Sequence, residues 1–323
     1  MTEAMTTPDA TAGKKAPTPR TWQIGRYALL LALAAVVVVT AIGNPRFLST
    51  NNLLNILFQI STLGVVAAGQ TMLLVSGGLD LSVGANLSVA GLAAALTILA
   101  TGSTTLGVFA GLVTGLLIGC ANGLLVASNR ANPFIITLGT MTFLQGVAVV
   151  ISGGSPVNGA GALFDLFGLG STFGIPNPAY IFAVVLIATW FVLGRVMLGR
   201  YAYAIGGNEE AARLSGVPVA RVKIGLYTLN GLIVGAAAVL LTGILDSALP
   251  NMGTGYELRA IAAVVIGGTP LSGGRGSVLG TLGGVLLLGL VSNSMNLLGV
   301  GANYQSAVLG LIITAAVLLQ KRT

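Results

Sequence analysis

The chain has 323 residues, of which 54% are hydrophobic and only 7% are charged, and its formal net charge is +7. A soluble domain carries roughly 25% charged residues, so this composition predicts a chain that faces lipid over most of its surface. The sequence has no histidine and one cysteine, Cys120, which excludes an intrachain disulfide and a metal site built on His or Cys. It also lacks a Walker-type phosphate loop and a nucleophile elbow. We therefore expect no catalytic residue, no metal site and no cofactor bound by this chain.

Residues 1–20 are polar and rich in Thr, Ala and Pro, a composition that predicts a disordered tail. The remainder, 21–323, is predicted to form a single transmembrane domain, because apolar segments of membrane-spanning length follow one another. Segment 258–271 is too short for a full crossing and is expected to be a broken or partial helix. We expect an all-α integral membrane protein with about ten transmembrane helices, at 27–43, 52–75, 83–101, 105–127, 133–151, 179–197, 224–246, 258–271, 278–298 and 303–320.

The basic residues predict the orientation. With the N-terminus in the cytoplasm, 13 of the 15 Lys and Arg residues fall on the cytoplasmic side, and only Arg46 and Arg259 fall outside. This is the bias of the positive-inside rule. Both termini are then cytoplasmic, which agrees with an even number of crossings.

One short pattern occurs twice between apolar segments. Residues 77–84 and 267–274 share Gly-Gly-x-x-Leu-Ser, and each copy follows one apolar run and precedes another. Recurrence of this kind is typical of membrane proteins built from two related halves. We therefore expect two pseudo-repeated groups of helices.

The first copy contains a carboxylate, Asp80, where the second has Pro270. Asp80 and Ser82 lie where a helix is expected to begin, so either could cap its free amides. A gating role near the cytoplasmic mouth is the next interpretation, and proton or sodium binding is a third. Because the repeat does not preserve the charge, we favour the structural role.

Glycines recur at every fourth position in two apolar segments. Such faces allow helix backbones to approach closely. Packing inside one subunit is the expected use, and a face shared with a second copy is the alternative. The residues are Gly111, Gly115, Gly119 and Gly123 in one segment, and Gly276, Gly280 and Gly284 in the other.

The longest charged loop, 198–223, is predicted to be cytoplasmic and to contain one short helix. Asn208 is a good N-cap, and Glu209 and Glu210 suit the positive end of the helix dipole. Gly216 can end the helix, and Pro218 prevents its extension. A helix of about two turns is unstable alone in water, so it must dock on its own membrane domain or on a partner.

Four segments together resemble a known family. Residues 77–84, 132–140, 199–223 and 262–276 are similar to the permeases of the ribose/xylose/arabinose group of bacterial ABC importers, within a wider family that includes branched-chain amino-acid permeases. The resemblance covers nearly everything after residue 45. It implies a type II importer bundle without catalytic residues, in the bacterial plasma membrane, paired with a second permease copy or a homologue.

The resemblance also implies partners. Cytoplasmic ATPase subunits would use ATP and magnesium, and a periplasmic or extracellular binding protein would deliver the solute, with Arg46 and Arg259 as candidates for its docking. Interfacial anchoring by snorkelling is the alternative for those two arginines. The short helix would be the coupling helix to the ATPase, or otherwise an ordinary interfacial helix; its residues are Asn208, Glu209, Glu210, Ala211, Ala212, Arg213, Leu214, Ser215 and Gly216.

Neutral polar residues interrupt the apolar segments. Such side chains suit a sugar better than an ion, because hydroxyl groups need donors and acceptors. Buried amides also join helices to one another, so we expect only two or three of them to line a path. The candidates are Gln59, Gln70, Asn86, Asn122, Thr137, Gln145, Asn230, Asn293 and Asn296.

The resemblance therefore implies a permease subunit that imports a small polar solute on ATP hydrolysis by a partner, and the neutral polar residues suit a monosaccharide. Branched-chain amino acids or nucleosides carried by the same mechanism are alternatives. An ion-coupled secondary transporter is a different class, which the lack of an intramembrane network of ionisable residues disfavours.

Overall fold

A computed structural model describes residues 19–128, 132–159, 161–301, 304–305, 307–308, 310–312 and 314–315. Nearly all of the predicted N-terminal tail lies outside these residues. The first helix begins at Pro19, so the last two residues assigned to that tail, 19 and 20, belong to a helix.

The fold is built of helices, as predicted. The described helices, in chain order, are α1 (Pro19–Gly43), η1 (Pro45–Leu48), α2 (Thr50–Val75), α3 (Val83–Thr101), α4 (Thr104–Ala127), α5 (Pro133–Ser152), α6 (Gly161–Leu163), η2 (Phe164–Gly168), α7 (Asn177–Arg195), α8 (Met197–Gly207), α9 (Glu209–Leu214), α10 (Val219–Leu245), α11 (Tyr256–Ile266) and α12 (Val278–Leu297). Two short antiparallel strand pairs are present among the described residues. The pair β1 (Val157–Asn158) and β4 (Ser247–Ala248) joins the segment after α5 to the segment after α10, and β2 (Ser171–Thr172) forms a hairpin with β3 (Ile175–Pro176).

Seven helices of the described chain are long and apolar enough to cross a membrane: α2, α3, α4, α5, α7, α10 and α12. Each matches a predicted span, and α3 has the predicted bounds. The count of ten is not confirmed. Three predicted spans are not among the seven. The described apolar part of α1, Leu29–Gly43, is shorter than a full span, and α11 is short, as expected for 258–271. Segment 303–320 is described only at scattered positions.

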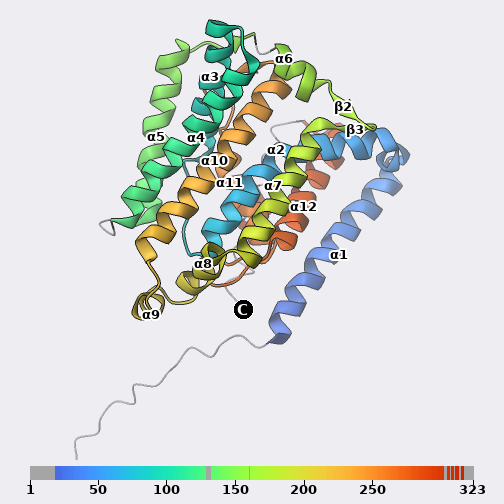
Figure 1. Cartoon of the computed structure of the whole chain (residues 1–323). Coiled ribbons are helices and arrows are strands. Elements are labelled where there is room, and N and C mark those ends of the chain that lie inside the picture. The colour runs from blue at the N-terminus through green and yellow to red at the C-terminus, as the bar shows by residue number, and fades with distance from the viewer. Residues whose placement is uncertain are drawn as a thin grey trace, which may run out of the picture.

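The core of the bundle is formed by α2, α3 and α10 (Figure 1). Of the most apolar 18 residues in each helix, 78% are buried in α2 and 72% in α3, against 17% in α5. The outer face of α5 therefore carries apolar side chains such as Phe143 and Val150, which are 68% and 80% exposed. A lipid environment accounts for such faces.

Glycines bring α4 and α10 together within this chain. A Cβ at Gly115 would lie 2.5 Å from the carbonyl oxygen of Gly231, and a Cβ at Gly119 would lie 2.7 Å from the Cα of Gly231. Gly284 on α12 packs in the same manner against Ala263 on α11. The glycine faces thus serve packing inside one subunit, as expected.

The two ends of the bundle differ. Helices α8 and α9 lie at the end where α1 begins, and the β2–β3 hairpin and α6 lie at the opposite end (Figure 1). By the predicted orientation the first of these ends is cytoplasmic.

Candidate functional site

The short helix α9 has the ends that its sequence predicts. The side chain of Asn208 accepts a hydrogen bond from the amide of Ala211 at 2.9 Å. At the other end Gly216 has a φ of 82°, and the amide of Val217 donates to the carbonyl of Ala212 at 3.1 Å. This is a Schellman motif, in which glycine takes the left-handed position.

The two apolar side chains of α9 face in different directions. Ala212 is 5% exposed and packs into the core of its own chain, whereas Leu214 is 81% exposed. The carboxylate of Glu209 forms ion pairs with Lys223 at 2.9 Å and with Arg213 at 3.1 Å. The helix is therefore docked on α10 through Ala212 and Glu209, and Leu214 is left at the surface.

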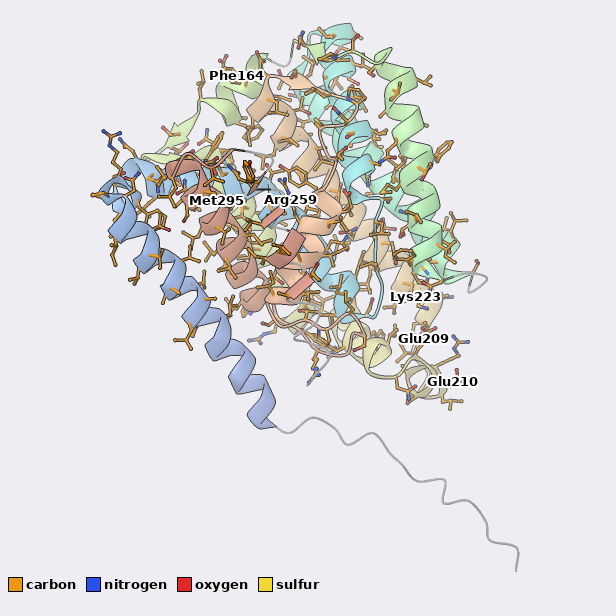
Figure 2. All side chains as sticks on the ribbon, turned by 180° about the vertical axis from the view of Figure 1, so that it is seen from behind. Phe164, Glu209, Glu210, Lys223, Arg259 and Met295 are labelled. Atoms are coloured by element: carbon orange, nitrogen blue, oxygen red, sulfur yellow. The ribbon has the colours of Figure 1, made fainter. Side chains whose placement is uncertain are left out.

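A basic groove lies beside α9. It has a volume of about 450 Å³ and runs between the end of α4 and the start of α10. Its charged lining residues are Arg213, Arg221 and Lys223. Glu209, Glu210 and Lys223 all lie at this end of the molecule (Figure 2).

Helix α8 was missed by the sequence analysis, which predicted a loop from residue 198 to α9. Tyr203 on this helix donates a hydrogen bond to the carbonyl of Gly276 at 2.9 Å. Burial raises the pKa of the Tyr203 hydroxyl above its ordinary value, so the group stays a neutral donor. Helix α8 is therefore held to the segment that precedes α12.

Backbone contacts between glycines join α8 to both copies of the repeated pattern. A Cβ at Gly206 would overlap the carbonyl oxygen of Val75 and the amide of Gly274. The amide of Gly274 donates to that same carbonyl of Val75 at 2.9 Å, and Gly273 packs against the backbone of Gly77. We call Val75, Gly77, Gly206, Gly273 and Gly274 the glycine junction. Its member on α8, Gly206, lies three positions before the first residue of α9.

The two copies of the pattern end their preceding helices with the same turn. After α2, the amides of Gly77 and Gly78 donate to Leu74 and Leu73. After α11, the amides of Gly268 and Thr269 donate to Val265 and Val264. The left-handed residue is Gly77 in the first copy and Gly268 in the second, with φ of 75° and 94°. The structural match is thus shifted by one position from the sequence match, which paired Gly77 with Gly267.

Asp80 is the centre of a buried polar cluster between α2, α3, α4 and α10. Its side chain is buried and accepts hydrogen bonds from the amide and hydroxyl of Ser82 at 2.9 and 2.6 Å. The amide group of Asn230 donates to its second oxygen at 3.1 Å. The side chain of Gln70 donates to its backbone carbonyl.

The cluster continues outward from Ser82. Asn122 donates to the Ser82 hydroxyl at 2.8 Å, and Thr140 on α5 donates to Asn122 at 2.7 Å. Tyr227 on α10 donates to the carbonyl of Leu79 at 2.8 Å. Three predicted path residues, Gln70, Asn122 and Asn230, thus hold the break between α2 and α3 in place.

Ser82 occupies the N-cap position of α3, but its side chain makes no capping hydrogen bond. The carboxylate of Asp80 accepts from the amide of Ser82 and not from the first turn of the helix. The structural contribution of Asp80 is therefore to fix the connection before the helix. Its proposed gating role is not tested by these contacts.

The other predicted path residues are scattered. Asn293 exchanges two hydrogen bonds of 3.0 Å with Asn52, which joins α12 to α2. Thr137 bonds to the carbonyl of Pro133 in its own helix. Asn86 donates to the carbonyl of Gly115 at 3.4 Å.

The remaining three are exposed. Gln59 lies on α2, Asn296 accepts from Gln305 at 2.7 Å, and Gln145 lines a cavity beside α3. This cavity is also lined by Glu257, Asn251 and Thr254. Asn251 and Thr254 lie in the loop before α11, which packs against the start of α3 through Gly253 and Gly84. The positions of apolar segments in the sequence do not predict such a contact.

The two arginines predicted to face outward lie on different elements. Arg46 belongs to η1, and Arg259 to α11; both are exposed. Arg259 lies partway along the bundle, below the end marked by Phe164 (Figure 2). The structure does not bring the two side chains together, and their role in docking stays a prediction. Within the described residues, no three His, Cys, Asp or Glu side chains gather in a way that could hold a metal ion.

Comparison with known proteins gives consistent matches over almost the whole chain. The chain is 42% identical over 307 residues to the ribose import permease protein RbsC of Escherichia coli K12, covering 94% of this chain and 95% of the relative. It is 44% identical over 294 residues to RbsC of Bacillus subtilis, covering 90% and 91%. The L-arabinose transport system permease protein AraH of Escherichia coli K12 is 39% identical over 316 residues, covering 97% and 96%.

No solved structure matches the chain. The model of one family, described as branched-chain amino acid transport system / permease component, matches residues 52–317. With seven long apolar helices, the chain is a multi-pass membrane protein, and it belongs to this family of transport permeases.

Proposed function

We propose that the chain is the membrane-spanning permease subunit of an ABC importer for a neutral monosaccharide of the ribose, xylose or arabinose type. The names of the similar permeases, at 39–44% identity, support the sugar. The observation that carries the proposal is α9, a short helix fixed to its own domain by Ala212 and Glu209 while Leu214 remains 81% exposed.

In this proposal the exposed face of α9 docks on a cytoplasmic ATPase subunit, which binds ATP and magnesium. An isolated exposed leucine adds little to a lone chain, but it can fill a pocket on a partner at the centre of an interface. The basic groove of Arg213, Arg221 and Lys223 beside it would receive acidic side chains of the same partner. ATP hydrolysis is thus assigned to another chain.

The glycine junction provides the route from α9 to the bundle. A shift of α9 would move α8 directly, because only Asn208 separates the two helices. Gly206 is in backbone contact with Val75 and Gly274, so the shift would reach α2 and the segment before α12 together. Packed elements of this kind move as rigid units and do not deform gradually.

The remaining assignments follow from the predicted orientation and the family. The chain lies in a bacterial plasma membrane with both termini in the cytoplasm, and it pairs with a second permease copy or a homologue. A solute-binding protein outside the membrane delivers the solute near the end that carries the β2–β3 hairpin.

The family description names branched-chain amino acids, so these are the first alternative solutes. Ion coupling is disfavoured by the polar cluster itself. The carboxylate of Asp80 already accepts three hydrogen bonds from Ser82 and Asn230, which leaves little capacity for binding and releasing an ion.

The test is uptake of radiolabelled D-ribose, L-arabinose and L-leucine into proteoliposomes that contain the chain and the proteins that co-purify with it from its native membrane. We expect recovery of an ATPase, and pentose uptake that requires ATP and the binding protein. Uptake by the purified chain alone under an ion gradient would contradict the proposal, and uptake of leucine in place of the pentoses would correct the solute.

A further inference from the structure

A small cavity with both apolar and polar lining residues lies between the start of α3, the outer half of α5 and the segment that precedes α11. Its volume is about 180 Å³. Pockets for drug-sized ligands measure roughly 300–1,000 Å³, so this one suits a single small solute. Its polar lining residues are Ser88, Gln145, Asn251, Thr254 and Glu257.

Two contacts hold the floor of the cavity. The hydroxyl of Ser88 accepts a hydrogen bond from the amide of Gly253 at 3.1 Å. Gly253 and Gly84 are in direct backbone contact, because a Cβ on Gly253 would overlap the carbonyl of Gly84. The segment before α11 is therefore fixed against α3, and the cavity is a built feature of the fold.

Glu257 supplies the charge of the cavity. One of its carboxylate oxygens accepts from the amide of Gly255 at 3.1 Å, and the other lies beside Gly84. The two ion pairs found among the described residues both belong to Glu209, so Glu257 has no cationic partner there. Arg259 lies two residues further along α11 and does not line the cavity.

Three other side chains of the lining make no hydrogen bond to any described residue. They are the amides of Gln145 and Asn251 and the hydroxyl of Thr254. Each offers both a donor and an acceptor, and the carboxylate of Glu257 offers strong acceptors. This set matches a neutral molecule with several hydroxyl groups, and it lacks the cation that an anionic solute requires.

We propose that this cavity is a solute-binding site on the transport path, which takes a neutral polyhydroxylated solute of pentose size. The carboxylate of Glu257 accepts hydrogen bonds from the solute hydroxyls and repels anionic analogues such as sugar acids. Gln145, Asn251 and Thr254 complete the hydrogen bonding. This inference rests on the proposed function and adds to it a location and a basis for selectivity.

Thiol labelling tests occupancy directly. Cys120 is the sole cysteine, so Val149→Cys in a Cys120→Ser background gives one reporter in the cavity. Val149 lines the cavity and is 52% exposed, and it supplies no hydrogen bond to the solute. Phe173→Cys, at a position 96% exposed in the β2–β3 turn, gives a control outside it. The chain in proteoliposomes is treated with a membrane-impermeant maleimide, with D-ribose, with D-ribonate or with neither.

We expect D-ribose to slow labelling at position 149 at least threefold, D-ribonate to have no effect, and labelling at position 173 to stay constant. Unchanged labelling at 149 in saturating ribose would overturn the inference. ATP-driven uptake is measured in parallel on the Phe173→Cys chain, which keeps every lining residue of the cavity. If that chain transports ribose and position 149 is not protected, only this inference fails. If that chain shows no ATP-driven uptake, the proposed function fails.

Substitution of the carboxylate tests selectivity. Glu257→Gln keeps an acceptor for the Gly255 amide and removes the charge. Hydrogen bonds to a charged acceptor are stronger than those to a neutral one, so we expect D-ribose uptake to fall about tenfold and the ribose-to-ribonate uptake ratio to fall with it. Asp165→Asn, which removes an exposed carboxylate in η2, is the matched control. Unaltered uptake and ratio in Glu257→Gln would contradict the assigned role.

Discussion

The two connections that follow the repeated Gly-Gly turns are held by opposite means. The first, residues 76–82, is held by side chains, with Asp80, Ser82 and Asn230 forming a hydrogen-bonded cluster. The second, residues 267–277, is held chiefly by close backbone packing, with Gly267 against Gly280 and Gly273 against Gly77, and by a side-chain hydrogen bond from Tyr203 to the carbonyl of Gly276. The same turn thus begins two connections that respond to different substitutions. The first is disturbed by loss of a polar side chain, and the second by replacement of a glycine with a larger residue.

Removal of the central carboxylate should have the largest effect. Asp80→Ala leaves the Ser82 amide, the Ser82 hydroxyl and the Asn230 amide without their acceptor. A buried polar group without a partner costs about 1–3 kcal/mol, so we expect a loss of about 3 kcal/mol or more in the free energy of unfolding, measured by thermal unfolding in detergent. Pro270→Ala in the second connection should cost less than about 1 kcal/mol. Equal losses in the two variants would contradict the comparison.

The glycine junction should respond next. Gly206→Ala places a methyl group against the backbone of Val75 and Gly274, whereas a Cβ at Gly207 would meet nothing within 4 Å. Overpacking of this kind costs about 1–3 kcal/mol. We expect Gly206→Ala to lose coupling between ATP hydrolysis and uptake, and Gly207→Ala to retain it.

A merely structural role of Gly206 would lower hydrolysis and uptake together. For this reason both rates are measured on the same proteoliposomes. Hydrolysis that continues without uptake in Gly206→Ala supports the junction as the route of coupling, and normal uptake in that variant would exclude it.

The two turn glycines should respond equally. Gly77 and Gly268 both have positive φ, and a left-handed conformation costs an ordinary L-residue about 1–2 kcal/mol. Gly77→Ala and Gly268→Ala are therefore each expected to lower stability by about this amount. A Cβ at Gly267 would meet the backbone of Gly280, whereas nothing lies within 4 Å of a Cβ at Gly268. If Gly267→Ala lowers the stability more than Gly268→Ala does, the contact with Gly280 accounts for the difference.

Local signals in the sequence predicted several elements well. The bounds of α3 at 83 and 101 and the cap of α9 at Asn208 were predicted correctly, because capping residues and glycine act through nearby backbone. Helix α8 was missed since Gly199, Gly206 and Gly207 favour a loop by propensity, while tertiary packing holds them in a helix. Propensity is a weak signal where packing decides.

The candidate site was harder to predict. The sequence showed that Ala212 and Leu214 share a helix, but not that the first faces the core and the second faces outward. It showed buried amides, but not that Gln70, Asn122 and Asn230 surround one carboxylate. Such groupings depend on contacts between residues far apart in the chain, which a single sequence does not contain.

Substitution of Leu214 should have the smallest effect on stability and the most direct effect on function. Because Leu214 is 81% exposed, Leu214→Asp should leave thermal unfolding unchanged within about 0.5 kcal/mol, and Leu214→Met serves as the conservative control. The measurement is ATP-driven pentose uptake in proteoliposomes, with the amount of co-purifying ATPase determined in the same preparation. The account predicts that Leu214→Asp loses both while Leu214→Met keeps both, and a Leu214→Asp chain that binds the ATPase and imports pentose normally would contradict it.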